Sequence, residues 1–147
     1  MIPFYVLIVS FTLFRLLGLF GWSYFDSWQT PLQGAVAIML LVTASAHWGK
    51  NRQDLIRMVP AAFPRPSWLI TATGGLEIAG AIGILLPATS RVASICLAIL
   101  LIAMFPANVK AARERLTIGG RPTPKLLART LLQIVFLAAV LLAGSAS

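Results

Sequence analysis

The sequence predicts an all-α membrane protein, a compact bundle of about five transmembrane helices that form a single domain over residues 1–147. Hydrophobic residues make up 59% of the 147 positions, and charged residues make up only 11%. An average soluble domain carries about 25% charged residues, so this chain has too little polar surface to face water on every side. The expected spans are the apolar runs at residues 2–20, 31–48, 67–86, 92–107 and 126–143.

Each run comes close to the roughly 20 residues that a helix needs to cross the hydrocarbon core. The first carries Arg15 and lacks a basic leading segment and a following small-residue cleavage site, so we expect it to stay as an anchor. The second ends at His47 and Trp48, and the third holds Glu77 among many glycines. The fifth contains Gln133.

The distribution of positive charge predicts the orientation. The loop after the second run has four Lys and Arg residues and the loop after the fourth has six, counted through Arg129 at the start of the fifth run, whereas the other two loops have none and one. Cytoplasmic loops retain Lys and Arg, so this pattern places both basic loops inside a cytoplasmic (inner) membrane of a bacterial cell. The N-terminus is then cytoplasmic and the C-terminus outside. A net charge of +8 gathered in two short loops also argues against nucleic-acid binding, which needs a basic face.

The sequence offers no self-sufficient catalytic set. Its single cysteine, Cys96, lies in an apolar run and has no second cysteine for a disulfide or a CxxC pair. We find no nucleophile–base pair, phosphate-binding glycine loop or dinucleotide fingerprint. Catalytic residues and an enzyme class are therefore left unassigned.

Two ionisable residues lie deep inside predicted spans. With the orientation above, Arg15 lies roughly 18 Å along the first span and Glu77 roughly 15 Å along the third. Charges near the membrane midplane are costly and usually face the bundle interior and pair. We therefore expect Arg15 and Glu77 to form an ion pair, either as a structural pin or as a polar site for a proton, a quinone head group or a small solute. The alternative is that Arg15 extends to an interface and never meets Glu77.

Small residues surround Glu77 on its helix. Those on the same face are Thr73, Gly74, Gly80 and Ala81. On the opposite face small residues recur every four positions, at Gly75, Ala79 and Gly83. Such a pattern lets helix backbones approach closely, so the third run is expected to be the central helix of the bundle.

Three further polar residues are candidates for an intramembrane site. His47 is either a proton relay or ligand, or an interfacial group beside Trp48; no metal site is expected, because no other ligand stands at metal spacing. Asn108, with Pro106, is expected to end the fourth span and to bond carbonyls freed there. Gln133 is expected to reach another helix or Glu77.

Several segments resemble the DoxX-like family of small integral membrane proteins. They are A-H-W at 46–48, M-V-P at 58–60, T-G-G-L-E-I-A-G-A-I-G-I-L-L-P at 73–87, F-P-A-N at 105–108 and R-T-L-L-Q at 129–133. The resemblance implies a four-helix core made by the second to fifth runs, with the first run as an addition. It also implies an association with quinone-linked or other membrane redox systems. The motif positions carried over are His47, Pro60, Glu77, Pro106 and Asn108, without a proven role for any of them.

Three functions from different classes follow. The first is a small integral subunit or accessory protein of a membrane redox system, with quinone as the candidate cofactor and a larger membrane oxidoreductase as the candidate partner. The second is a transporter or channel for protons or a small solute, which a chain of this size would perform as a homo-oligomer or around a water-filled cavity. The third is a structural or assembly protein of the lipid bilayer.

Overall fold

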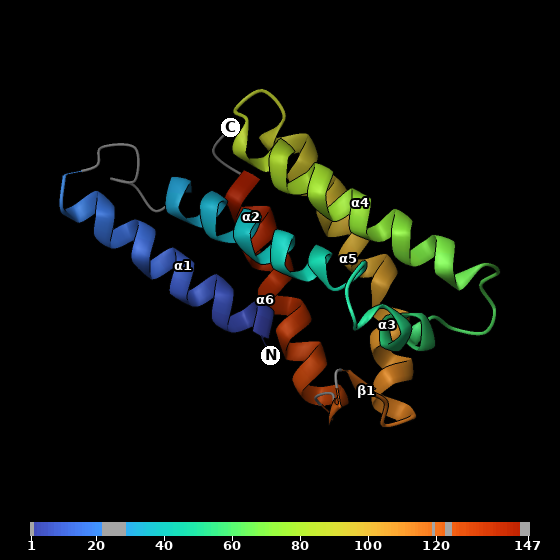
Figure 1. Ribbon diagram of the computed structural model, residues 1–147. Coiled ribbons are helices and arrows are strands. Elements are labelled where there is room, and N and C mark those ends of the chain that lie inside the picture. Colours follow the sequence, from blue (N-terminus) through green and yellow to red (C-terminus); the bar gives the residue numbers. More distant parts are fainter. Residues whose placement is uncertain (1, 22–28, 119, 123–124, 145–147) are drawn as a thin grey trace.

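The computed structural model describes residues 2–21, 29–118, 120–122 and 125–144. In these ranges the chain is almost entirely helical (Figure 1). The elements are α1 (Ile2–Leu19), α2 (Gln29–Ser45), α3 (Arg52–Met58), α4 (Pro66–Leu85), α5 (Ser90–Arg113), β1 (Thr117–Ile118), β2 (Arg121–Pro122) and α6 (Leu126–Gly144). The prediction of an all-α fold is confirmed. The strands β1 and β2 form a single two-residue antiparallel pair.

The five long helices coincide with the five apolar runs, and α3 is a short additional helix in the first basic loop. Pro66 begins α4, where its fixed φ fits the first turn and its missing N–H costs nothing. The expectation that Pro106 and Asn108 end the fourth run is wrong, because α5 continues to Arg113. Pro106 removes one backbone hydrogen bond but does not stop the helix, whose last turn is polar.

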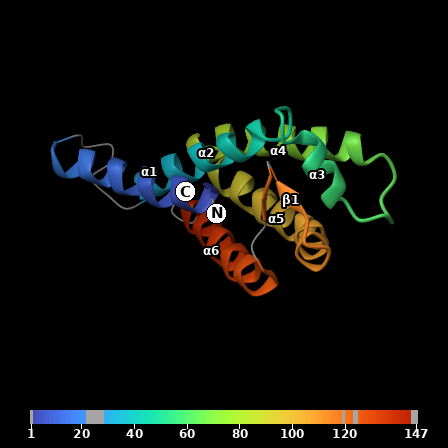
Figure 2. The ribbon, with the colours of Figure 1, turned by 60° about the horizontal axis from the view of Figure 1, so that its bottom comes forward.

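Four helices form a ring, and the fifth lies outside it. α2 packs against α4 and α6, while α5 packs against the same two helices, so that α2 and α5 face each other diagonally. α1 packs on the outer side of α2 (Figures 1 and 2). The core between them is apolar, and its most deeply buried side chains include Val36, Leu40, Ile84 and Val140.

The central helix is α2 and not α4, which corrects the expectation from the glycine pattern. Protein covers α2 on three sides, and its core-facing residues Ala35 and Val36 are 0% exposed. On α4, by contrast, a Cβ added at Gly75 would meet nothing within 4 Å, and Ala79 is exposed. Small residues permit close approach of a neighbour, but on this face of α4 the described chain supplies none at Gly75, whereas a Cβ added at Gly83 would lie 3.0 Å from Ala93 Cβ.

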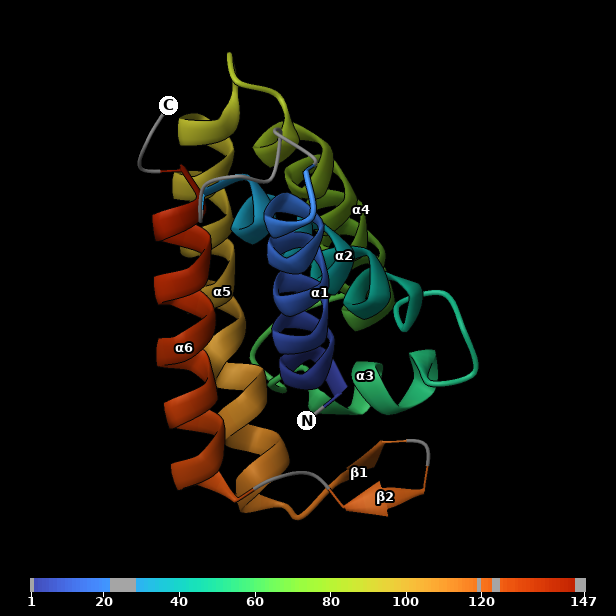
Figure 3. The same cartoon turned by 90° about the vertical axis from the view of Figure 1, so that its left-hand side faces the viewer.

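Both basic loops lie at the same end of the bundle. α3 and the β1–β2 pair are at the end where α1 begins, and α6 ends at the other (Figure 3). We call these the basic end and the opposite end. Among the described helices, α4, α5 and α6 are long and apolar enough to cross a membrane, while the apolar stretches of α1 and α2 are shorter. The count of five spans stays a prediction.

Candidate functional site

Glu77 is the most deeply buried carboxyl group in the described part of the chain. α4 directs it toward α2, and the residue is only 4% exposed. There the hydroxyl of Thr43 donates a hydrogen bond to Glu77 Oε2 at 3.0 Å. The same hydroxyl lies 2.9 Å from the carbonyl oxygen of Leu40, in its own helix. A threonine hydroxyl has one proton, so Thr43 can donate to only one of these two acceptors at a time.

His47 lies beside this pair. After Ser45 the chain makes two more short-range hydrogen bonds, Ala46 N to Thr43 O and His47 N to Ala44 O, which extend the spiral of α2. His47 is therefore one turn beyond Thr43 on the same face, and it is 4% exposed. Its Nδ1 is 3.0 Å from the carbonyl oxygen of Thr43 and 3.9 Å from Glu77 Oε2. It is thus a buried residue between α2 and α4, and its depth in a membrane stays a prediction.

A glycine makes this approach of α2 to α4 possible. Gly74 is one turn before Glu77 and faces His47. A Cβ at Gly74 would lie 2.9 Å from His47 Cβ and 2.8 Å from the ring of Trp48, closer than real Cβ contacts allow. Any larger residue at position 74 would push the histidine away from the carboxylate. Thr43 and His47 on α2 and its extension thus face Gly74 and Glu77 on α4.

Two buried polar atoms of the site have no partner among the described residues. The Nδ1 of His47 must carry the ring proton to donate to the Thr43 carbonyl, so in the neutral ring Nε2 is an acceptor. No hydrogen bond within the described chain reaches that Nε2, and none reaches Glu77 Oε1. Buried polar groups are nearly always hydrogen-bonded, so these two atoms require an explanation.

Arg52 fixes the histidine from the basic end. Its guanidinium donates to the His47 carbonyl at 2.7 Å. It also donates to the carbonyl and hydroxyl of Ser67 at 2.9 and 3.1 Å, and to the hydroxyl of Thr71 at 2.9 Å. One side chain therefore ties the end of α2 to the first turns of α4. Sequence reasoning counted Arg52 only as a loop charge. The available signal was a cation just beyond a helix C-terminus, where carbonyls lack partners.

The structure does not bring Arg15 to Glu77. Within the described residues the side-chain polar contacts of Glu77 are to Thr43 and His47, so the predicted ion pair is absent. Arg15 is on α1, which packs against α2 on the side away from α4 (Figure 2). A similar depth along two helices does not make them neighbours, and here α2 stands between them.

The remaining predicted residues form a separate group between α5 and α6. Gln133 donates to the carbonyl of Leu101 at 2.7 Å, so it does reach another helix, but not Glu77. Asn108 accepts a hydrogen bond from Arg129 at 2.7 Å through its side-chain oxygen. Pro106 lies between these two contacts along α5, where its missing N–H weakens the helix. The group holds α5 and α6 together and is not part of the Glu77 site.

A third polar group lies at the opposite end. The amide of Gln33 donates to the hydroxyl of Ser90 at 3.1 Å and to the carbonyl of Ala143 at 2.8 Å. The hydroxyl of Ser94 donates to the carbonyl of Val140 at 2.7 Å. Neutral side chains thus join α2, α5 and α6 there. No group of three or more His, Cys, Asp or Glu residues in the described ranges is placed to hold a metal ion.

A family described as a domain of unknown function (DUF8561) matches residues 36–143, which include Thr43, His47, Arg52 and Glu77. No curated protein matches the chain, and no solved structure matches it. The resemblance to the DoxX-like proteins stays a prediction.

Proposed function

Given that the chain belongs to the DUF8561 family, we propose that it is a small integral membrane accessory protein of a membrane redox system. In this proposal all five long helices span the inner membrane, the N-terminus and the basic end are cytoplasmic, and the C-terminus is outside. The apolar α4, α5 and α6 support insertion, and the position of both basic loops at one end supports the orientation.

The observation that carries the proposal is the pair of buried acceptors, Glu77 Oε1 and His47 Nε2. An ionisable group inside a membrane bundle is expensive, and such groups most often mark a ligand or proton site. Gln33 also keeps one acceptor, Oε1, that no described residue reaches, but the side chains around it are neutral, whereas here the two leftover acceptors belong to ionisable groups. These two unpaired acceptor atoms favour a ligand that carries hydrogen-bond donors.

A quinone head group fits this requirement in its reduced form, because its hydroxyls are donors. Glu77 and His47 would hold it, and when bound it would supply the redox chemistry, taking up and releasing protons together with electrons. The residues of this chain would orient the head group and exchange protons with it. Thr43 aligns the carboxylate, and Arg52 fixes the backbone of His47. The electrons then have to come from a larger membrane oxidoreductase, since Cys96 has no second thiol in this chain with which to form a redox pair.

The proposal is tested by mass analysis of the small molecules retained by the purified protein. Wild type is compared with Glu77→Gln and with Glu114→Gln, which makes the same chemical change at an exposed carboxylate. We expect quinone in wild type and in Glu114→Gln, and about tenfold less in Glu77→Gln because a hydrogen bond to a charged group is lost. Protein without quinone in every membrane extract, or equal retention in all three proteins, would contradict the proposal.

Partner and orientation are tested separately. Mild extraction followed by affinity purification should retain a membrane oxidoreductase, and isolation of the chain alone under every condition would count against an accessory role. A reporter that is active only in the cytoplasm should be inactive when fused to the C-terminus. An active fusion would overturn the orientation and leave the quinone result unaffected.

A structural pin is the second candidate, and the contact of Gly74 with His47 favours it. Such close packing would be needed if the Thr43–Glu77 hydrogen bond served only to fix α2 against α4. In that case Glu77→Gln, which keeps an acceptor for Thr43, should leave both stability and bound molecules unchanged. The same three proteins therefore separate the two candidates.

A further inference from the structure

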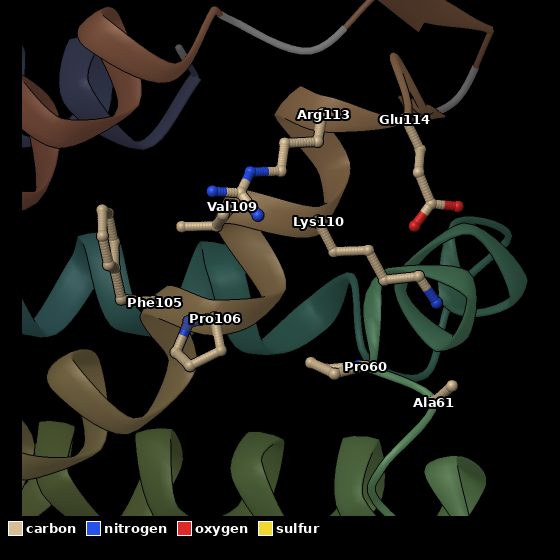
Figure 4. A pocket seen from close by; sticks show the side chains of 8 residues that line it. All are labelled: Pro60, Ala61, Phe105, Pro106, Val109, Lys110, Arg113 and Glu114. Carbon is tan, nitrogen blue, oxygen red and sulfur yellow. The ribbon is translucent and has the colours of Figure 1, made fainter.

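A cavity of about 560 Å³ lies at the basic end, away from the Glu77 site. It is bounded by the last turns of α5 and by the loop that follows α3 (Figure 4). Its apolar lining includes Pro60, Phe105, Pro106 and Val109, and its charged lining includes Lys110 and Arg113. The lining is therefore apolar on one side and charged on the other, which is the combination that an amphipathic ligand requires.

An apolar stripe on α5 leads into this cavity. Four of its residues, spaced three or four apart, are between 49% and 64% exposed: Val92, Ile95, Ile99 and Ile102. The same spacing continues through Pro106 and Val109 to Arg113. Residues at this spacing share one helical face, so a single outward stripe runs from the opposite end of α5 to the cavity and ends on a cation.

The charged side of the cavity is suited to an anion. Arg113 is exposed, and in the described part of the chain it has neither an ion pair nor a side-chain hydrogen bond. Lys110 donates to the carbonyl of Val59 at 2.8 Å, which fixes the loop as a cavity wall. The Arg113 guanidinium points toward Val109, whereas the Glu114 carboxylate lies on the other side of the view, the same side as the Lys110 ammonium (Figure 4). The cation is thus available to a ligand.

We propose that the cavity and the α5 stripe bind one acidic phospholipid, with its phosphate at Arg113 and an acyl chain along the stripe. Ile102 is about 16 Å from Arg113 along the helix, close to the roughly 15 Å of one hydrocarbon leaflet. The acyl chain then covers Val109, Pro106 and Ile102. Cations at this level attract the anionic lipids of the inner leaflet, and a second cation, Lys110, adds to the preference. The inference rests on the proposed membrane insertion but not on the redox role.

The test is native mass spectrometry of the purified full chain with equal amounts of phosphatidylglycerol and phosphatidylcholine of the same acyl composition. We expect wild type to retain about fivefold more phosphatidylglycerol, because a nearby cation favours the anionic lipid. Arg113→Gln should bring the two lipids close to parity, and Arg113→Lys should keep most of the preference. Arg91→Gln, at the other end of the same helix, is the matched control and should behave as wild type.

A second variant keeps the test decisive if Arg113→Gln does not fold. Val109→Trp fills the cavity while preserving every charge, and it should lower retention of both lipids. An unchanged preference in Arg113→Gln, or an equal loss in Arg91→Gln, would overturn the proposal in favour of a general charge effect. Extraction of the chain from membranes by alkaline carbonate would refute insertion itself, and with it both proposals, whereas failure of the lipid test alone leaves the quinone site standing.

Discussion

The bundle contains two groups of buried polar side chains that differ in whether they can carry charge. At the opposite end, Gln33 and Ser94 are neutral and donate to acceptors on α5 and α6. Between α2 and α4, Glu77 and His47 are ionisable and each keeps one acceptor atom without a partner in the described chain. Both groups join helices, but only the second contains ionisable side chains.

This contrast indicates which buried polar residues are candidates for binding a ligand or a proton. A neutral group whose donors are hydrogen-bonded lowers the free energy of the folded bundle, because a donor without a hydrogen bond in hydrocarbon is costly. An ionisable group with leftover capacity costs free energy in the isolated chain and is best explained by a ligand or a proton. The comparison predicts that mutations around Gln33 lower stability more than ligand retention, whereas mutations of Glu77 lower ligand retention more than stability.

The largest effect is expected from Gly74→Leu, which attacks the contact between α4 and His47. The new side chain has no room, so the free energy of unfolding should fall by about 3 kcal/mol. The adjacent Gly75→Leu points into open space and should change it by less than about 0.5 kcal/mol. Denaturant titration in mixed micelles, followed by circular dichroism, measures both. Similar losses in the two variants would mean that α4 is rotated from the position described.

Next in size is the contrast between Gln33→Leu and Glu77→Leu. Gln33→Leu leaves the Ser90 hydroxyl and the Ala143 carbonyl without their donor and should cost about 2 kcal/mol of unfolding free energy. Glu77→Leu removes a costly buried carboxyl and should be neutral or stabilising in the same titration. If Glu77→Leu proves the more destabilising of the two, the Glu77 site is a structural pin.

A smaller effect separates two arginines of the first basic segment. Arg52→Ala loses hydrogen bonds to His47, Ser67 and Thr71 and should lower the unfolding free energy by about 1.5 kcal/mol. Arg57, which is exposed and forms an ion pair with the partly buried Asp54 one turn earlier, should contribute less than about 0.5 kcal/mol. Thermal melts of the two alanine variants side by side test this order. Equal melting temperatures would show that Arg52 does not fix α2 to α4.

The smallest change is expected from Gln133→Leu. It removes one hydrogen bond between α6 and α5, and such bonds between membrane helices average about 0.6 kcal/mol. The variant should retain quinone and lipid as wild type does, because Gln133 belongs to neither site. Loss of quinone in this variant would link the α5–α6 group to the Glu77 site after all.

Much of the fold follows from the sequence, because a long apolar run can bury its backbone polar groups in hydrocarbon only as a helix. The five runs accordingly match α1, α2, α4, α5 and α6. Pro106 predicts an earlier end of α5 than Arg113, but a helix can continue past proline when neighbouring groups satisfy its carbonyls.

The site was predictable only in part. Glu77 could be found because a carboxylate inside an apolar run is rare. Its partner could not, since depth along a helix gives one coordinate and does not say which helix is adjacent. The sequence placed Arg15 opposite Glu77, but the packing of α1 behind α2 separates them. The burial of His47 and the role of Arg52 depend on how the chain turns after Ser45, which hydrophobic periodicity does not encode.

In the proposed membrane arrangement, the enclosure of α2 restricts how the protein can contact a neighbour in the plane of the bilayer. α2 carries Thr43 and leads to His47, yet it is wrapped by α1, α4 and α6 and shows few side chains outward. α4 is different, since it holds Glu77 inward while the adjacent Leu76 and the nearby Ile82 are more than half exposed. In the proposed membrane arrangement, a subunit that approaches sideways would therefore contact α4, which has a residue in the site and the more exposed apolar face of the two described helices that form it.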